Sequence, residues 1–419
     1  MAQEHITLLD NRRVILGVTG SIAAYKAADL ASKLTQAGAL VDVIMTEAAR
    51  QFVTPLTFQS VTGRPVYTTM WQADSSGGLP THIAHVGLGE GADLLIIAPA
   101  TAHTLARLAH GLADDLLSVT ALAARGPVLV APAMDGGMYA HPATQANLDI
   151  LRSRGVIVIE PDEGRFASGL VGRGRLPETP ALLGAIRLAL ARGGILAGRR
   201  CVITAGGTRE PLDPVRHLTN RSSGKQGYAL AQAALDAGAA VTLISTVRDL
   251  PVPVGADVVR VDTAAEMLAA VEAHLPGADA LIMAAAVADF RPASAAEQKI
   301  KKSDDPAEGL HLELARTPDI LLAVRAQRDQ TGWPRVVVGF AAESEDLLAN
   351  AQGKLARKGL DLIVANDISA PDAGFEVDTN RVVLLDAHGG QQALDLTSKA
   401  RVAEIVIERV ASLVIERSG

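Results

Sequence analysis

A segment dense in cationic side chains offers the clearest chemistry in this 419-residue chain. It follows an apolar run at 201–204, which we read as a buried strand, and it reaches a helix start near Ser223. About fifteen residues without apolar periodicity are uncommon inside a compact α/β unit and are usually functional. The segment carries Arg209, Arg216, Arg221 and Lys225. Guanidinium groups and the free N–H groups of a helix start both favour phosphate, so we predict an anion site. The alternative is a serine-capped surface loop.

A second candidate site follows the first apolar run of the chain. Gly20 permits close backbone approach, and Ser21 can cap a helix or bond a phosphate. The turn lacks the G-x-G-x-x-G dinucleotide pattern, so an NAD dehydrogenase is disfavoured. Ligands of doubly wound sheets bind beyond the carboxyl ends of the strands. Small residues at three later strand ends therefore predict a narrow crevice for a flat ring, and they are Thr46, Ala98, Pro99, Ala100, Thr101, Ala131, Pro132, Ala133 and Met134.

The elements that must position these residues alternate between Val/Ile/Leu runs and alanine-rich amphipathic stretches. That alternation predicts parallel sheets covered by helices. In the first half we expect strands at 13–18, 41–45, 94–98, 128–131 and 156–159, with helices at 23–36, 101–109, 114–124 and 143–154. In the second half we expect strands at 200–204, 240–245, 258–261, 280–284, 335–339, 361–365 and 382–386, and a last helix at 398–415.

Glycines at 193, 194 and 198 separate the two halves. We expect domains at 1–192 and 193–419, each a Rossmann-like three-layer α/β domain with a mostly parallel sheet, the first of them flavodoxin-like. A chain of this length is expected to hold more than one core.

Composition excludes several classes of protein. A formal charge of −7 argues against a nucleic-acid partner. The single cysteine, Cys201, excludes a disulfide framework and favours a reducing, cytoplasmic location. Residues 1–10 do not have the order of a signal peptide, and no apolar run of about 18 residues predicts a membrane span.

Four ordered motifs in the first half carry a family resemblance. They are His85–Leu94, Ala98–Ala102, Pro132–Tyr139 and Ser168–Arg175. This half resembles the flavin-containing cysteine decarboxylases that act on phosphopantothenoylcysteine. The resemblance implies FMN in the crevice between subunits of a trimer. It also implies oxidation of the cysteinyl thiol by the flavin, loss of the carboxylate, and return of the electrons. His85 matches the catalytic histidine, and His82 is the rival.

Two residues depart from that family's pattern. Asp135 stands where the family has an asparagine, beside Met138, in the segment implied to bind substrate. Two anions about 4 Å apart repel by about 4 kcal/mol at an effective dielectric of 20, so we expect Asp135 to pair with an arginine. Ser168 stands where better-known members have a proton-donating cysteine. A hydroxyl is a far weaker acid than a thiol, so we expect another group or a water to supply the proton.

The second half resembles phosphopantothenate–cysteine ligases. The opening segment carries the resemblance, together with Ala284–Arg291, Lys299–Lys302, Thr317–Ile320, Val338–Glu343 and Ala365–Asp367. The resemblance implies CTP as cosubstrate, Mg²⁺ on its phosphates, and an acyl cytidylate that cysteine attacks. It assigns catalysis to Asn220 and Lys299. It assigns substrate or nucleotide binding to Arg216, Asp289, Pro318, Asp319, Ile320, Leu321, Phe340, Lys354 and Lys358. The residues alone do not decide between CTP and ATP.

Together the halves resemble the bifunctional coenzyme A biosynthesis proteins, whose small-molecule substrates are 4′-phosphopantothenate, cysteine and CTP. The resemblance implies a homo-oligomer with a trimeric flavin domain and a dimeric ligase domain, which a dodecamer would satisfy. Two alternatives stay open. One is an active ligase joined to a flavin domain that oxidises without completing the reduction, and the other is a regulatory flavoprotein.

Overall fold

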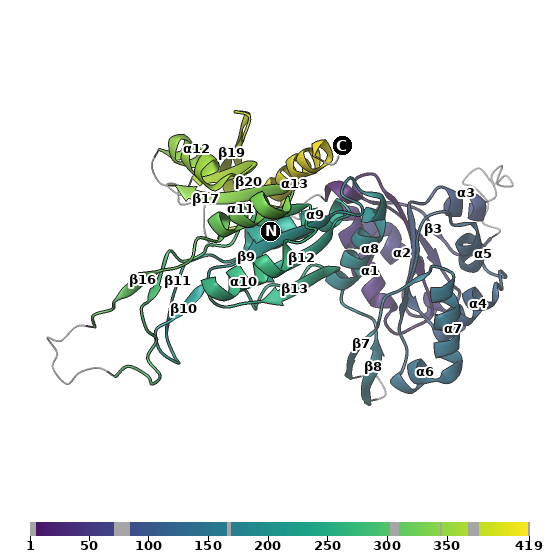
Figure 1. Ribbon diagram of the computed structural model, residues 1–419. Helices are drawn as coiled ribbons and strands as arrows, with labels where there is room; N and C mark the ends of the chain where they lie inside the picture. Colours follow the sequence, from purple (N-terminus) through teal and green to yellow (C-terminus); the bar gives the residue numbers. More distant parts are fainter. Residues whose placement is uncertain are drawn as a thin grey trace. The chain divides into compact units, whose positions relative to one another are not determined.

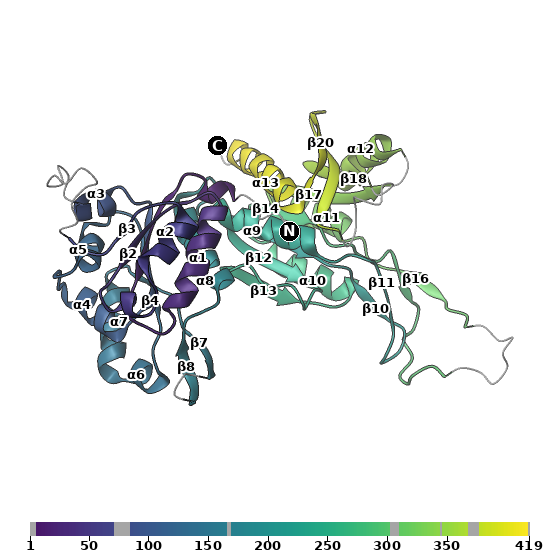
Figure 2. The same ribbon diagram turned by 180° about the vertical axis from the view of Figure 1, so that it is seen from behind.

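The computed structural model describes residues 6–70, 84–165, 169–301, 310–343, 346–367 and 377–417. The chain forms two compact units, Met1–Ala191 and Arg192–Gly419, which are considered separately below (Figures 1 and 2).

Unit 1 is built on a six-stranded parallel sheet with the order β3-β2-β1-β4-β5-β6. Its strands are β1 (Arg13–Val18), β2 (Leu40–Met45), β3 (Val66–Tyr67), β4 (Leu94–Ala100), β5 (Val128–Pro132) and β6 (Ile157–Val158). The strand order reverses direction between β1 and β4, which is where doubly wound sheets bind ligands. Both faces are covered, so β1 reads as an almost continuous apolar run, as buried parallel strands do.

Helices cover both faces of this sheet. They are α1 (Ala24–Gln36), α2 (Pro55–Thr62), α3 (Ala84–Glu90), α4 (Ala102–His110), α5 (Leu116–Ala123), α6 (Gly136–Ala140), α7 (Pro142–Ser153) and α8 (Thr179–Leu190), with short 3₁₀ turns at η1 (Thr7–Leu9), η2 (Ala49–Gln51) and η3 (Ala191–Gly193). One buried cluster joins the sheet to α1, α2 and α8, and a second joins it to α3, α4, α5 and α7.

A hairpin of β7 (Asp162–Arg165) and β8 (Val171–Arg175) lies outside the sheet. No strand is expected at these residues from the sequence. Both strands are mostly exposed, so no apolar alternation marks them in the sequence.

Unit 2 holds an eight-stranded sheet with the order β13-β12-β9-β14-β17-β18-β19-β20. The strands are β9 (Arg200–Ala205), β12 (Ala240–Ser245), β13 (Ala256–Arg260), β14 (Ala280–Met283), β17 (Val336–Glu343), β18 (Leu362–Asp367), β19 (Thr379–Asp386) and β20 (Gln391–Ser398). The first six are parallel, and β19 and β20 add an antiparallel edge. The strand order reverses between β9 and β14.

The helices of unit 2 are α9 (Lys225–Asp236), α10 (Ala264–His274), α11 (Ile320–Thr331), α12 (Leu347–Lys358) and α13 (Lys399–Glu416). Helices α9 and α13 share one buried cluster with the sheet, and α10, α11 and α12 share another. Cys201 is completely enclosed in the first of these clusters, and burial raises the pKa of its thiol to about 12.

Two small antiparallel hairpin ladders extend from one end of unit 2 and form an arm (Figure 1). The first pairs β10 (Arg209–Pro211) with β11 (His217–Thr219), and the second pairs β15 (Phe290–Pro292) with β16 (Leu314–Arg316). The cationic segment, predicted to lack regular structure, therefore contains a hairpin. Each of its strands has only three residues, which is too short to show a period in sequence.

The longer predicted strands and helices appear within a few residues of their expected positions. The elements that were not expected from the sequence include β3, β20, α2, α3, α10 and α11.

Among the described residues, no helix is both long and apolar enough to span a membrane.

Candidate functional sites

The strand ends of unit 1 converge at the point where the strand order reverses. Thr19, directly after β1, donates its hydroxyl to the carbonyl of Pro99 at 2.7 Å and accepts from the N–H of Thr101 at 3.1 Å. These bonds tie the loop after β1 to the end of β4. The structure thus brings together the predicted residues 98–101 and the turn that holds Gly20 and Ser21.

Gly20 lies where no larger residue fits. A Cβ added to it would come within 2.4 Å of the Cβ of Ala48, in the turn after β2. Thr46 lies in that same turn and accepts from the N–H of Ala49 at 3.3 Å. The loops after β1 and β2 are therefore in close contact beside the α1 N-terminus.

A cavity of about 370 Å³ opens beside the start of α1. Its lining includes three of the predicted residues, Ser21, Met134 and Asp135. Its cations come from α1 and from the β7–β8 hairpin, and they are Lys26, Arg165 and Arg175. Two apolar side chains in its wall are largely exposed, Ile22 at 64% and Tyr25 at 63%. A site with cations and uncovered apolar surface suits a ligand that carries both an anionic group and a flat ring.

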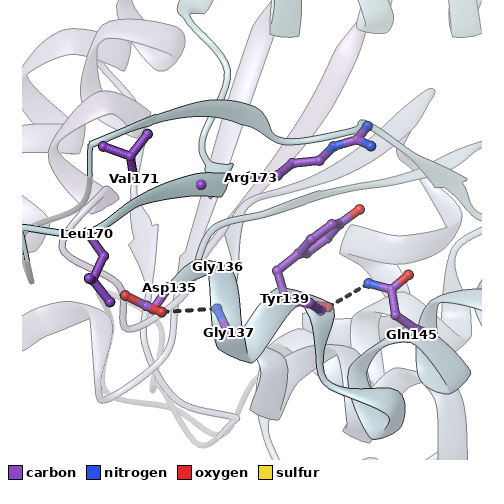
Figure 3. Close-up of a pocket in the computed structure, with 10 residues that line it drawn as sticks. Asp135, Gly136, Gly137, Tyr139, Gln145, Leu170, Val171 and Arg173 are labelled. Carbon is purple, nitrogen blue, oxygen red and sulfur yellow. Dashed lines mark hydrogen bonds between the residues drawn. The ribbon is translucent and has the colours of Figure 1, made fainter.

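A larger cavity of about 510 Å³ lies between α6 and the β7–β8 hairpin (Figure 3). Asp135 lines both cavities and caps α6, accepting from the N–H of Gly137 at 3.0 Å. Across the cavity Leu170 of the hairpin lies close to Asp135 (Figure 3). The expected pairing of Asp135 with an arginine stays a prediction. Met138 is exposed on α6 and does not line this cavity.

Glu160 links the base of the hairpin to α6 and α7. It accepts from the hydroxyl of Tyr139 at 2.8 Å, from Arg152 at 2.6 Å and from Arg173 at 3.0 Å. Burial alone would raise the pKa of Glu160, but the hydrogen bonds from Tyr139 and Arg152 outweigh it and lower that pKa. Tyr139 and Arg173 also line the larger cavity, so this cluster fixes one of its walls.

The histidine and serine predicted to be catalytic in unit 1 have different outcomes. His85 is half-buried on α3, which packs against α5, and neither of the two cavities is lined by it. Ser168 and the rival His82 lie outside the described residues.

In unit 2 a smaller cavity of about 110 Å³ is lined by residues directly after β14 and by residues near the carboxyl ends of β17 and β18. It lies where the strand order reverses, at the start of α9. Its lining is Ser222, Ser223, Gly224, Lys225, Gln226, Gly227, Ala284, Ala285, Ala286, Phe340, Ala341, Asn366, Asn380 and Lys399. The last residues of the predicted anion segment therefore line this cavity, and Phe340 contributes to its wall.

Other predicted ligase residues do not line this cavity, and one of them, Asn220, contacts its wall. Asn220 donates its side-chain amide to the carbonyl of Ala286 at 2.9 Å. Asp289 follows three residues later and accepts through its carbonyl from the N–H of Thr317 at 3.0 Å. Asp319 caps α11 and pairs with Lys358 of α12 at 3.3 Å.

The remaining residues of this predicted set have mixed placements. Pro318 is exposed beside Asp319, whereas Ile320 is buried in the core at 3% exposure and Leu321 packs against that core. Lys354 lies one turn before Lys358 on α12 and is half-buried. Ile320 therefore contributes packing and could contact a ligand only through its backbone.

Arg216 and Lys299 lie on the arm. Asp213 accepts from Arg216 at 2.6 Å, and Arg216 in turn donates to the carbonyl of Ile300 at 2.6 Å. Burial would raise the pKa of Asp213, but bonds from Arg216 and from the N–H groups of Val215, Ile300 and Arg216 hold it well below its usual range. Lys299 is exposed next to Ile300 and does not line the cavity of unit 2. Asn220 and Asp289 do not line that cavity either, although Asn220 contacts its wall through Ala286, so a cleft shared by Asn220, Asp289 and Lys299 stays a prediction.

Sequence reasoning missed three polar residues of the cavity, Asn366, Asn380 and Lys399. Asn366 lies in the predicted motif Ala365–Asp367 but was given no role. Lys399 begins α13, and in sequence it looks like an ordinary surface lysine after a serine cap. No cluster of three His, Cys, Asp or Glu side chains suited to a metal occurs among the residues the structure describes.

Comparison with known proteins identifies both units. Residues 2–190 match the flavoprotein family, and residues 196–414 match the DNA/pantothenate metabolism flavoprotein C-terminal domain. The fold, the cavities and these matches define a flavoprotein domain joined to a second α/β domain of pantothenate metabolism.

Full-length relatives narrow the class. The coenzyme A biosynthesis bifunctional protein of Bacillus subtilis is 46% identical over 409 residues, covering 97% of this chain and 98% of the relative. The protein of the same name from Mycolicibacterium smegmatis is 45% identical over 419 residues, covering 97% and 99%. A crystal structure of the C-terminal domain of such a protein is 36% identical and covers 54% of this chain and 100% of that domain, with a TM-score of 0.45. The chain belongs to the family of coenzyme A biosynthesis bifunctional proteins.

Proposed function

We propose that this protein catalyses two consecutive steps of coenzyme A biosynthesis. Unit 2 joins 4′-phosphopantothenate to cysteine, and unit 1 decarboxylates the product to 4′-phosphopantetheine. The observation that carries the proposal is a cavity in each unit beside a helix start, at the carboxyl edge of a doubly wound sheet, in a chain similar to bifunctional relatives along 97% of its length. A purely regulatory flavoprotein would not require the second cavity.

The ligation needs an activated carboxylate, since a carboxylate is a poor electrophile. We infer that the carboxylate of phosphopantothenate attacks the α-phosphate of CTP and pyrophosphate leaves. The amine of cysteine then attacks the acyl carbon, and CMP leaves with the electron pair of the broken bond. Mg²⁺ would neutralise the triphosphate. In unit 2 the start of α9, Lys225 and the wall at Phe340 would hold the nucleotide.

Asn220 would donate a hydrogen bond to the oxygens of the acyl phosphate. Its side-chain nitrogen reaches Ala286, whose carbonyl lies at the carboxyl end of the sheet beside the cavity. A fixed amide donor there would stabilise charge as it develops on the acyl phosphate oxygens. Asp289 bonds Thr317, two residues before Asp319, and Asp319 pairs with Lys358, so these three residues would contact the remainder of the nucleotide together.

Lys299 has no role within its own cavity, because it lies exposed on the arm. We propose that the arm carries Lys299 to the nucleotide of a second copy, within a dimer of the ligase unit. A lysine supplied in trans would add its charge to the triphosphate only when the dimer has formed.

Mixing two inactive variants tests this arrangement. Asn220→Ala and Lys299→Ala should each abolish ligation. If Lys299 acts in trans, equal mixing should restore about a quarter of wild-type turnover, since half the dimers are mixed and each mixed dimer has one intact site. If Lys299 acts in its own subunit, every site in the mixture stays defective and no turnover returns. The two variants are mixed under native conditions until their subunits have exchanged, and the release of CMP is then measured.

The smaller cavity of unit 1 fits FMN. Ser21 and the start of α1, with Lys26, Arg165 and Arg175, would hold its phosphate, while the backbone at Gly20, Thr46 and residues 98–101 and the side chain of Met134 would border its ring. When bound, the flavin supplies reversible two-electron redox chemistry at the cysteinyl thiol. Exposed Ile22 and Tyr25 would be covered by the ring or by a neighbouring copy in a trimer.

The residues of this chain would position the decarboxylation substrate. Asp135 caps α6 and lines the cavity below the β7–β8 hairpin that would close over the substrate, and Met138 is exposed on α6 and would contact the substrate from there. His85 would act from a neighbouring copy, since it lines neither cavity of its own unit. Ser168 would hold a relayed water as proton donor. With its lone thiol enclosed, we place the protein in a reducing cytoplasm.

One reaction mixture tests both activities. Protein is incubated with phosphopantothenate, cysteine and either CTP or ATP, and products are identified by mass. Phosphopantetheine with CMP is the expected result. Accumulated enethiol without phosphopantetheine would show that Asp135 and Ser168 stop the second half-reaction, and absence of any amide would overturn the ligase assignment.

A further inference from the structure

Two helices of unit 2 begin at the same cavity, and each begins with a lysine. Lys225 is the first residue of α9, and Lys399 is the first residue of α13. A helix N-terminus carries a partial positive charge and free N–H groups, so a cation there is electrostatically unfavourable. Neither lysine is placed to stabilise its own helix. The arrangement instead concentrates positive potential in a cavity that both side chains line.

Lys399 is the more unusual of the two because it is only 7% exposed. Its ammonium group donates to the carbonyl of Val377. Burial, followed by repulsion from Lys225, lowers the pKa of Lys399, whereas Asp378 opposes that shift. Asp378 is a carboxylate close to both ammonium groups, and its attraction offsets the shift only in part. Burying an ammonium group is costly unless an anion compensates it.

A hydrogen-bond network fixes the two helix starts relative to each other. Gln226 donates to the carbonyl of Lys399 at 3.1 Å and accepts from the side chain of Asn380 at 3.2 Å. Lys225 pairs with Asp378 at 2.6 Å. The first residues of α9, α13 and β19 thus form one connected wall, so the position of Lys399 in the cavity is set before any ligand arrives.

An independent observation points to a ligand in the same cavity. Asn366 lines the cavity and is 9% exposed. The oxygen of its side-chain amide, Oδ1, has no hydrogen-bond partner among the residues the structure describes. A buried acceptor without a donor is costly, so a bound molecule that brings an N–H or O–H group would satisfy it. The cavity therefore suits a molecule with an anion at one end and a donor close by.

We propose that Lys399 is a further binding residue of the ligase, and that its ammonium group contacts a phosphate of the substrate pair in this cavity. The phosphate belongs either to the nucleotide or to the phosphorylated acid, and both carry hydroxyl groups that Asn366 can accept from. The proposal rests on the ligase function proposed above and adds a contact that the sequence motifs did not assign.

Titration of the full chain with inorganic tripolyphosphate tests the contact without catalysis. Lys399→Gln keeps a donor for the Val377 carbonyl but removes the charge. We expect calorimetry to show that this variant binds tripolyphosphate at least about tenfold more weakly than the wild type does. Lys399→Arg should restore most of the affinity. Arg401→Met, which removes an exposed cation from the same turn of α13, is the matched control and should bind as the wild type does. Equal affinity for Lys399→Gln and wild type would overturn the proposal.

Steady-state ligation then identifies which phosphate is bound. A rise in the KM for CTP alone assigns Lys399 to the nucleotide, and a rise in the KM for phosphopantothenate alone assigns it to the acid. A fall in kcat with every KM unchanged would contradict a binding role. If the wild type makes no amide, the ligase assignment fails, yet the tripolyphosphate titration still decides whether Lys399 binds phosphate. A melting temperature for each variant shows that it is folded.

Discussion

Asp213 illustrates how one side chain determines local structure. Its carboxylate accepts from the N–H groups of Val215 and Arg216 and from the side chain of Arg216, and it also accepts from the N–H of Ile300. It thus joins the turn of the β10–β11 hairpin to the irregular segment after β15 that carries Lys299. A single carboxylate therefore determines how the two parts of the arm lie together.

The variant Asp213→Asn should loosen the arm and slow ligation by roughly tenfold, because Lys299 would lose its fixed position. The lowered pKa of Asp213 means that the stabilising contribution is present above its unfolded pKa, about 3.9, and is lost as the pH falls through the folded value. The backbone amides of the wild-type arm should therefore keep their protection from hydrogen–deuterium exchange down to about pH 4, as measured by mass spectrometry. Asp249→Asn, on an exposed loop, is the control, and equal ligation rates for both variants would contradict this role.

Gly227 is a second position where one atom decides the packing. A Cβ there would lie 2.5 Å from the Cβ of Ala205 and 2.8 Å from the carbonyl oxygen of Thr204, so α9 would have to move off β9. We expect Gly227→Ala to destabilise the protein by about 1–3 kcal/mol, as overpacking does. Gly353→Ala on α12 meets open space and should leave the melting temperature unchanged or raise it. Thermal unfolding of both variants checks the contrast.

At the scale of elements, the β7–β8 hairpin depends on the cluster around Glu160. That carboxylate connects Arg173 of β8 with Tyr139 of α6 and Arg152 of α7. The hairpin is outside the sheet, so these polar contacts at its base take the place of strand pairing.

Replacing Glu160 with glutamine should free the hairpin. We expect faster tryptic cleavage in it and a few-fold rise in the KM for decarboxylation, since exposed ion pairs each contribute about 0.2–1 kcal/mol. Ligation should be unaffected. Glu163→Gln on β7 changes an exposed side chain of the same charge and serves as the control. If Glu160→Gln leaves both cleavage and KM at wild-type values, the cluster does not hold the hairpin.

At the scale of the whole molecule, each unit has its own sheet and its own pair of buried clusters. Such units are expected to fold alone. Residues 1–191 and 192–419, expressed separately, should therefore both be folded, the first yellow with bound flavin and the second able to form amide. Calorimetry of the intact chain should show two transitions matching those of the separate pieces. Unfolding of either piece on its own would contradict this independence.

Long buried strands and amphipathic helices could be predicted from the sequence, because burial on both faces leaves continuous apolar runs such as Leu94–Ala100. The converging ends at Thr19 and Pro99 followed from the rule that parallel strands end at one edge. Exposed hairpins could not be predicted in this way, since their stability comes from cross-strand bonds and from side chains such as Asp213.

The polar residues in the wall of the unit 2 cavity could not be predicted from the sequence either. Lys399 and Gly224 are 175 residues apart, and only the packing of α13 against α9 places both in that wall. Lys299 was expected among the catalytic residues of its own cleft, but the arm carries it away, because the β15–β16 ladder extends from the sheet. The motif around Lys299 could be recognised in the sequence, whereas its separation from the cavity of unit 2 could not.

The enclosed Cys201 has a practical consequence. A protein thiolate can attack the disulfide of cystine, the oxidised form of cysteine, to form a mixed disulfide and release one cysteine thiolate. Here the sole sulfhydryl is inaccessible and stays protonated at neutral pH, so that reaction is blocked. A cysteine engineered into the arm would thus be the only group to take a maleimide dye, and the native chain would serve as its own unlabelled blank. Movement of the arm toward a second copy could then be followed by fluorescence.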